Sequence, residues 1–156
     1  LDFSNEESHS NFQSTLNRLL ELNVIPIINE NDTIATQEIS VGDNDTMGAI
    51  VAENVQADLL IILSDIDGLY TGDPRNNPDA QLIDTIFSIT PEIKELAGTK
   101  GTTLGTGGMI TKIHAAEIAM DAGIDMIIAN GTRPELLYKI LDGDKVGTKF
   151  IGRKKG

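Results

Sequence analysis

The sequence contains no cysteine, and no apolar run in it approaches the roughly 20 residues that a membrane-spanning helix needs. These absences exclude a disulfide framework and argue against a transmembrane helix. Only two histidines occur, His9 and His114, and neither has a second histidine at ligand spacing. Neither a zinc site nor a catalytic triad is therefore supported. We expect a soluble protein of the reducing cytoplasm, with no membrane partner.

Positive charge is also scarce. Lys and Arg number 12 against 24 Asp and Glu, and the formal net charge is −12. A nucleic-acid-binding surface needs clustered Lys and Arg, so this balance argues against a nucleic-acid partner. We interpret the basic cluster Arg153, Lys154 and Lys155 as a solvated tail. The expected partners are small molecules and further copies of the chain in a homo-oligomer.

What is present is enough apolar sequence for one domain: 156 residues, 40% of them hydrophobic. Apolar periodicity predicts helices over residues 12–22, from 43 to about 55, over 91–96, from 109 to about 123, and over 134–141 with Gly143 as its cap. Apolar runs predict strands at 24–28, 58–63, 82–83 and 124–128, and an edge strand within 146–151. This alternation predicts an α/β fold, an αβα three-layer sandwich with a mostly parallel sheet.

Two polar segments carry the chemistry. Gly42-Asp43-Asn44-Asp45 is an acidic amide cluster that can hold a small zwitterion or the shell of a Mg²⁺ ion, although Asp and Asn at a helix start are also common caps. The glycine-rich segment 105–112 offers bare backbone N–H groups and one cation, Lys112, at a helix start, where phosphates bind. It fits neither the Walker A nor the GxGxxG pattern, and a flexible surface loop with a solvated lysine is the alternative.

Two further polar segments follow predicted strands. Asn29-Glu30-Asn31-Asp32 comes directly after residues 24–28, and Ser64-Asp65-Ile66-Asp67-Gly68 ends the apolar run 58–63. Open α/β sheets place their ligands at the carboxyl ends of their strands. The second segment is therefore a candidate ligand contact, and the first is either a site or a turn.

These segments, taken in order together with Leu69-Tyr70-Thr71-Gly72-Asp73-Pro74-Arg75, resemble the amino acid kinase family from about residue 11 to residue 151. The resemblance implies ATP and Mg²⁺ as cofactors and L-glutamate as the acceptor, phosphorylated on its γ-carboxylate in the first step of proline biosynthesis. Relatives with other acceptors (aspartate, N-acetylglutamate, carbamate or UMP) and a non-catalytic binding module are the alternatives, and the Asn29 to Asp32 and Gly42 to Asp45 segments favour glutamate.

The resemblance also implies roles for particular residues. Lys112 and Asp45 match catalytic positions, the lysine stabilising charge on the transferred phosphoryl group and the aspartate orienting lysines. Asp32 and Asn44 match glutamate-binding positions, with no residue assigned as a protein metal ligand. The positions that match nucleotide contacts are Ser64, Asp65, Thr106, Gly107, Gly108, Met109, Ile110, Thr111 and Lys112.

The sequence departs from the family pattern at its N-terminal end. The family's domain starts with a strand, a glycine-containing loop and a second catalytic lysine, and this sequence has no counterpart of them before its first predicted helix. We therefore expect residues 1–156 to form a partial amino acid kinase domain that is inactive alone.

Overall fold

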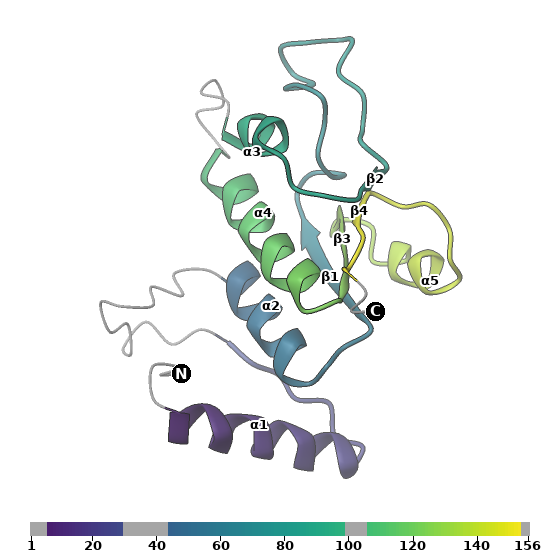
Figure 1. Cartoon of the computed structure of the whole chain (residues 1–156). Coiled ribbons are helices and arrows are strands. Elements are labelled where there is room, and N and C mark those ends of the chain that lie inside the picture. Colours follow the sequence, from purple (N-terminus) through teal and green to yellow (C-terminus); the bar gives the residue numbers. More distant parts are fainter. Residues whose placement is uncertain (1–5, 30–43, 99–105, 154–156) are drawn as a thin grey trace.

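The computed structural model describes residues 6–29, 44–98 and 106–153 (Figure 1). The elements in chain order are α1 (Glu6–Glu21), α2 (Asn44–Asn54), β1 (Leu59–Ser64), β2 (Thr85–Ile86), α3 (Pro91–Gly98), α4 (Thr106–Asp121), β3 (Asp125–Asn130), α5 (Leu136–Leu141) and β4 (Thr148–Phe150). The five predicted helices are all present. α1 begins six residues and α4 three residues before the predicted starts, so Lys112 lies nearly two turns into α4 and not at its start as predicted. α5 begins two residues later than predicted, and Gly143 takes a left-handed φ of 89° just after it.

The four strands form one sheet in the order β1-β3-β4-β2. β1 pairs with β3 and β2 with β4 in parallel, whereas β3 and β4 are antiparallel. The prediction of a mostly parallel sheet is confirmed. The prediction that residues 146–151 form an edge strand is wrong, because β4 lies inside the sheet with a neighbour on each side.

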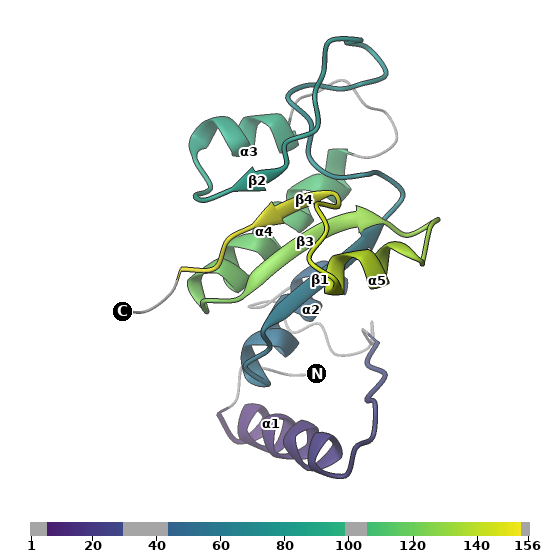
Figure 2. The ribbon, with the colours of Figure 1, turned by 90° about the vertical axis from the view of Figure 1, so that its right-hand side faces the viewer.

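The sheet buries its two faces under different helices. Ile62, Met126 and Ile128 belong to a core cluster that also contains residues of α2 and α4, whereas Ile127 and Ala129 cluster with Ile140 of α5. Successive strand residues point to opposite faces, so these two clusters lie on the two sides of the sheet. Figures 1 and 2 show α2 and α4 on one side and α5 on the other. The three-layer prediction is confirmed.

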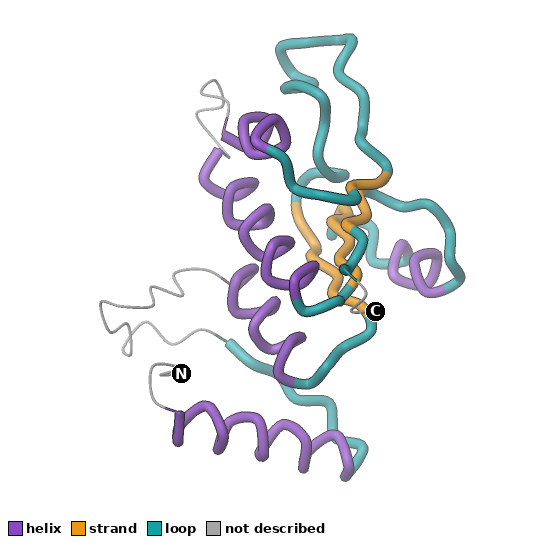
Figure 3. The backbone as a smooth tube through the Cα atoms, viewed as in Figure 1, coloured by secondary structure: helices purple, strands orange, loops and turns teal. Residues whose placement is uncertain are grey.

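The predicted strand at residues 24–28 is absent. This segment is a loop after α1 (Figure 3), with Ile25 87% and Ile27 96% exposed. An apolar run forms a strand only where a neighbour accepts its backbone hydrogen bonds, and within residues 6–29, 44–98 and 106–153 no strand lies beside it. The strand predicted at residues 82–83 is also displaced: Leu82 makes an isolated bridge to Tyr70, and β2 begins at Thr85.

The loop that leaves β1 is fixed against β4 by close backbone contact. The Leu69 N–H donates to the Oγ1 of Thr148, a residue with no exposed surface, over 2.8 Å. Gly147 has a φ of 65°, and a side chain there would place Cβ 1.9 Å from the Ile128 carbonyl oxygen and 3.0 Å from that of Asp67. Glycine is therefore required where the two segments meet.

In the described ranges no helix combines the length and the apolar character needed to cross a membrane.

Candidate functional site

Lys112 and Asp45 form an ion pair across two helices. The distance from Lys112 Nζ to Asp45 Oδ2 is 2.9 Å, and the side chains are only 12% and 19% exposed. Lys112 is thus mostly shielded, in contrast to the solvated lysine considered as the alternative for this segment. A shielded ion pair is screened less by salt than an exposed one, so the attraction between these two side chains persists at physiological salt. The two residues assigned catalytic positions are therefore in direct contact.

Small side chains let the two helices bring this pair together. Asp45 shares one face of α2 with Ala49, and Lys112 shares one face of α4 with Ala115 and Ala116, since residues three or four apart lie on the same side of a helix. All three alanines have no exposed surface. Alanine keeps the helix axes close, so an aspartate on one helix can reach a lysine on the other.

Thr111 also contacts Asp45. Its Oγ1 lies 2.8 Å from Asp45 Oδ2, the same oxygen that Lys112 contacts, and 2.9 Å from the Gly108 carbonyl oxygen. A hydroxyl carries one proton and can donate fully to only one of these acceptors. Asp45 is thus approached by two consecutive residues of α4.

The carboxyl ends of β1 and β3 and the amino ends of α2 and α4 lie at the same edge of the sheet. β1 and β3 run in parallel toward Ser64 and Asn130, and α2 and α4 run in the opposite direction past them (Figure 1). The amino ends of both helices therefore lie toward the carboxyl ends of the strands. Unpaired N–H groups at helix amino ends favour anions, which is the setting a phosphate requires.

A second polar cluster lies at this edge. Asp67 Oδ1 accepts hydrogen bonds from Asn130 Nδ2 at 2.9 Å and from an Arg133 guanidinium nitrogen at 3.1 Å, and Tyr70 donates to its other oxygen at 3.3 Å. Asn130 is the last residue of β3, so the cluster ties the exit of β1 to the exit of β3. Asp67 belongs to the polar segment predicted at the end of β1, but its three partners were not predicted from the sequence. The available signal was that Asn130 also ends an apolar run.

These contacts shift two ionisation equilibria. The hydrogen bond from Asn130 is the largest cause that lowers the pKa of Asp67 below its ordinary value of 3.8; partial burial opposes it, and Tyr70 and Arg133 act in the same direction as Asn130. Burial, followed by the charge and hydrogen bond of Asp67, raises the pKa of Tyr70 above 10.0. The cluster therefore favours a charged carboxylate beside a neutral phenol.

We predict that the stabilising effect of Asp67 depends on pH. Because its pKa in the folded state lies below that of an unfolded chain, about 3.9, the carboxylate stabilises the fold above that pH, and this contribution is lost as the pH falls through the lowered pKa. Urea unfolding of the wild type and Asp67→Asn should therefore show the larger difference near neutral pH, shrinking toward pH 3. A difference that stays constant over this range would contradict the assigned contacts.

The other predicted site residues are placed as follows. Asn44 is exposed at the first position of α2, next to Asp45. Ser64 ends β1, and its hydroxyl lies 3.2 Å from Oδ1 of the exposed Asp65. On α4, Met109 packs against the core cluster, whereas Ile110 is 51% exposed. Gly108 is exposed on the same helix, which also includes Thr106 and Gly107. Asp32 lies outside the described residues.

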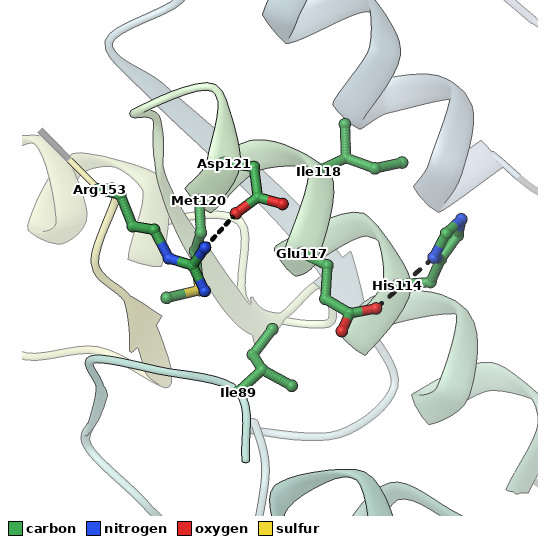
Figure 4. A pocket seen from close by; sticks show the side chains of 7 residues that line it. All are labelled: Ile89, His114, Glu117, Ile118, Met120, Asp121 and Arg153. Carbon is green, nitrogen blue, oxygen red and sulfur yellow. Dashed lines mark ion pairs between the residues drawn. The ribbon is translucent and has the colours of Figure 1, made fainter. Parts of the chain in front are cut away.

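A hollow of about 370 Å³ lies on another face of α4 (Figure 4). It contains neither Asp45 nor Lys112. Its charged side chains already contact opposite charges: Arg153 lies 2.7 Å from Asp121, and Glu117 forms an ion pair with Lys94 of α3. We therefore do not assign this hollow to the site.

Proteins of known function are similar to this chain in sequence. A glutamate 5-kinase of Clostridium perfringens is 51% identical over 154 residues, covering 96% of this chain and 57% of the relative. One of Deinococcus radiodurans is 52% identical over 150 residues, covering 96% and 41%. The chain thus spans about half the length of the curated relatives it matches.

Solved structures are similar as well. A carbamate kinase from Giardia lamblia, bound to AMP-PNP, superposes with a TM-score of 0.60 at 25% identity, covering 90% of this chain and 49% of the other. A uridylate kinase from Archaeoglobus fulgidus gives 0.51 at 26% identity, with 68% and 45% covered. The sequence model of the amino acid kinase family matches residues 1–130 of this chain. With most of its length matched in this way, the chain belongs to the amino acid kinase family.

Proposed function

We propose that this chain forms part of the active site of an ATP-dependent kinase that phosphorylates the γ-carboxylate of L-glutamate, giving glutamyl 5-phosphate for proline biosynthesis. The observation that carries the proposal is the shielded Lys112–Asp45 pair, which joins the first turn of α2 to the second turn of α4. Identity of about 50% to relatives named glutamate 5-kinase supports glutamate as the acceptor.

The chemistry asks little of the protein beyond alignment and charge. The γ-carboxylate of glutamate is already ionised at neutral pH, so no general base is needed to activate it. Negative charge on the transferred phosphoryl group must be stabilised, and the ammonium group of Lys112 supplies a positive charge at a fixed place. Asp45 fixes that place through its 2.9 Å contact with Lys112. In this mechanism Asp45 orients Lys112, and Lys112 stabilises charge on the transferred phosphoryl group.

The remaining assigned residues divide between the two substrates. Asp32 would hold the ammonium group of glutamate, and Asn44, beside Asp45 on α2, would donate to a carboxylate group. Ser64 and Asp65 at the carboxyl end of β1 and the first turns of α4 would hold the nucleotide, with helix N–H groups directed at its phosphates. This arrangement brings acceptor and donor together at one edge of the sheet.

Magnesium fits this site as a companion of ATP. Among the described residues, no group of three His, Asp or Glu side chains could form a metal cage. Mg²⁺ commonly retains several waters and is held by substrate phosphates with one or two carboxylates, so the ion would arrive on the nucleotide. It would supply further positive charge to the phosphates.

The proposal is tested by measuring ADP release from ATP by the intact polypeptide with a panel of acceptors: L-glutamate, L-aspartate, N-acetyl-L-glutamate, carbamate and UMP. We expect release that depends on L-glutamate, together with an acyl phosphate that hydroxylamine traps as a hydroxamate. Release with another acceptor alone would overturn the acceptor assignment. Nucleotide binding without turnover on any acceptor would instead favour a non-catalytic module.

A further inference from the structure

We propose that Thr111 is a positioning residue that fixes the carboxylate of Asp45, and through it the ammonium group of Lys112, rather than a contact to the nucleotide. This inference rests on the proposed kinase function and deepens it. It gives Thr111 a role different from the one implied by the family resemblance.

Two side chains of α4 contact the same carboxylate oxygen of Asp45. Asp45 Oδ2 lies 2.8 Å from Thr111 Oγ1 and 2.9 Å from Lys112 Nζ. The terminal torsion of an aspartate is broad, and a lysine has four rotatable bonds, so this ion pair alone would leave both groups several arrangements. Threonine is branched at Cβ and stiff about χ1. In a helix its hydroxyl is limited to two main positions, so it is the most restricted member of the cluster.

The direction of the hydroxyl proton follows from the two acceptors. Thr111 Oγ1 is 2.8 Å from Asp45 Oδ2 and 2.9 Å from the Gly108 carbonyl oxygen. Either choice leaves a hydroxyl lone pair facing the other oxygen, and this contact is more repulsive with the charged carboxylate of Asp45 than with the neutral Gly108 carbonyl. Donation to the carboxylate instead gives a charge-assisted hydrogen bond, the stronger kind. The one proton of Thr111 is thus committed to Asp45.

The placement of the residues on α4 supports the same role. Thr111 and Lys112 are neighbours in sequence and so point in directions about 100° apart around the helix. Both nevertheless contact Oδ2 of Asp45, a residue of α2 whose side chain is 19% exposed. Two donors that converge on one oxygen from different directions restrict the carboxylate more than either could alone.

The test compares Thr111→Val, which keeps the shape and removes the hydroxyl, with Thr111→Ser, which keeps the hydroxyl. Loss of one hydrogen bond to a charged group should lower kcat of the intact enzyme about 10- to 100-fold in the valine variant. We expect KM for ATP, and the Kd for ATP measured by calorimetry, to change less than about threefold, and the serine variant to recover most of kcat. Thr15→Val is the matched control, since the Thr15 hydroxyl bonds Asn11 O on the surface of α1.

A second measurement does not depend on turnover. In protein labelled with ¹⁵N-lysine, the ammonium signal of Lys112 should be visible in the wild type and in Thr111→Ser, and should broaden in Thr111→Val as the pair loosens. An unchanged signal with full kcat in Thr111→Val would overturn the proposal, as would a tenfold weaker Kd for ATP with unchanged kcat. A wild type inactive on every acceptor would instead refute the kinase function, and the Lys112 signal would still decide the role of Thr111.

Discussion

Lys112→Ala should lower kcat of the intact enzyme by about 100- to 1000-fold, the usual effect of removing one group that stabilises charge in the transition state. The ammonium group is held at one place by Asp45, so neither water nor a flexible surface lysine can substitute for it. The expected loss of stability is smaller, about 1–3 kcal/mol, because Asp45 keeps the Thr111 hydroxyl as a donor. The measurements are steady-state kinetics at saturating glutamate and ATP, and urea unfolding.

Lys94→Ala is the matched control for this experiment. Lys94 is also ion-paired, with Glu117, but it lies on α3 and is 55% exposed. Exposed pairs of this kind contribute about 0–1 kcal/mol, so the control should alter neither kcat nor stability to a measurable degree. Comparable kcat values for Lys112→Ala and Lys94→Ala would remove Lys112 from the mechanism.

Gly147→Ala should destabilise the protein by about 2–5 kcal/mol, which is a large share of the stability of a small domain. Two causes add. An alanine at a φ of 65° is strained, and its Cβ would lie 1.9 Å from the Ile128 carbonyl oxygen, a distance that only a backbone shift can relieve. Urea unfolding monitored by circular dichroism gives the difference directly.

Gly143 separates the two causes. It also has a left-handed conformation, with φ of 89°, but nothing lies within 4 Å of a Cβ built there. Gly143→Ala should therefore cost only the conformational part, about 1 kcal/mol. If both alanine variants unfolded at the same urea concentration, the close packing of Gly147 against Ile128 would be disproved.

The parts of the fold that could be predicted are those with strong local patterns. The helices α2 and α4 and the strands β1 and β3 follow from apolar spacing within three residues, and the end of α1 does too, whereas α1 begins six residues before its predicted start. Residues 24–28 were mistaken for a strand because an apolar run signals a preference for burial and says nothing about a neighbouring strand. The inner place of β4 was missed for the same reason, since pairing order depends on contacts between distant segments.

Part of the candidate site could likewise be predicted from the sequence, and part of it could not. The family resemblance implied that Asp45 orients lysines and that Lys112 is a catalytic lysine, and the structure places the two side chains 2.9 Å apart, while their roles stay a prediction. The partners of Asp67 could not be found in this way, because Asn130 and Arg133 lie 63 and 66 residues away along the chain. The role inferred for Thr111 also needed coordinates, since a pattern of residue types cannot tell where one proton points.

The order of the strands has a consequence for synthesis on the ribosome. β2 is only two residues long and pairs with β4, so Thr85 and Ile86 must wait for Lys149 and Phe150 to be translated before they find a partner. Until then a nascent chain can pair β1 with β3, but the far side of β3 stays open. Unpaired strand edges attract other chains. Translation that stalls before Thr148 would therefore leave an intermediate prone to aggregate.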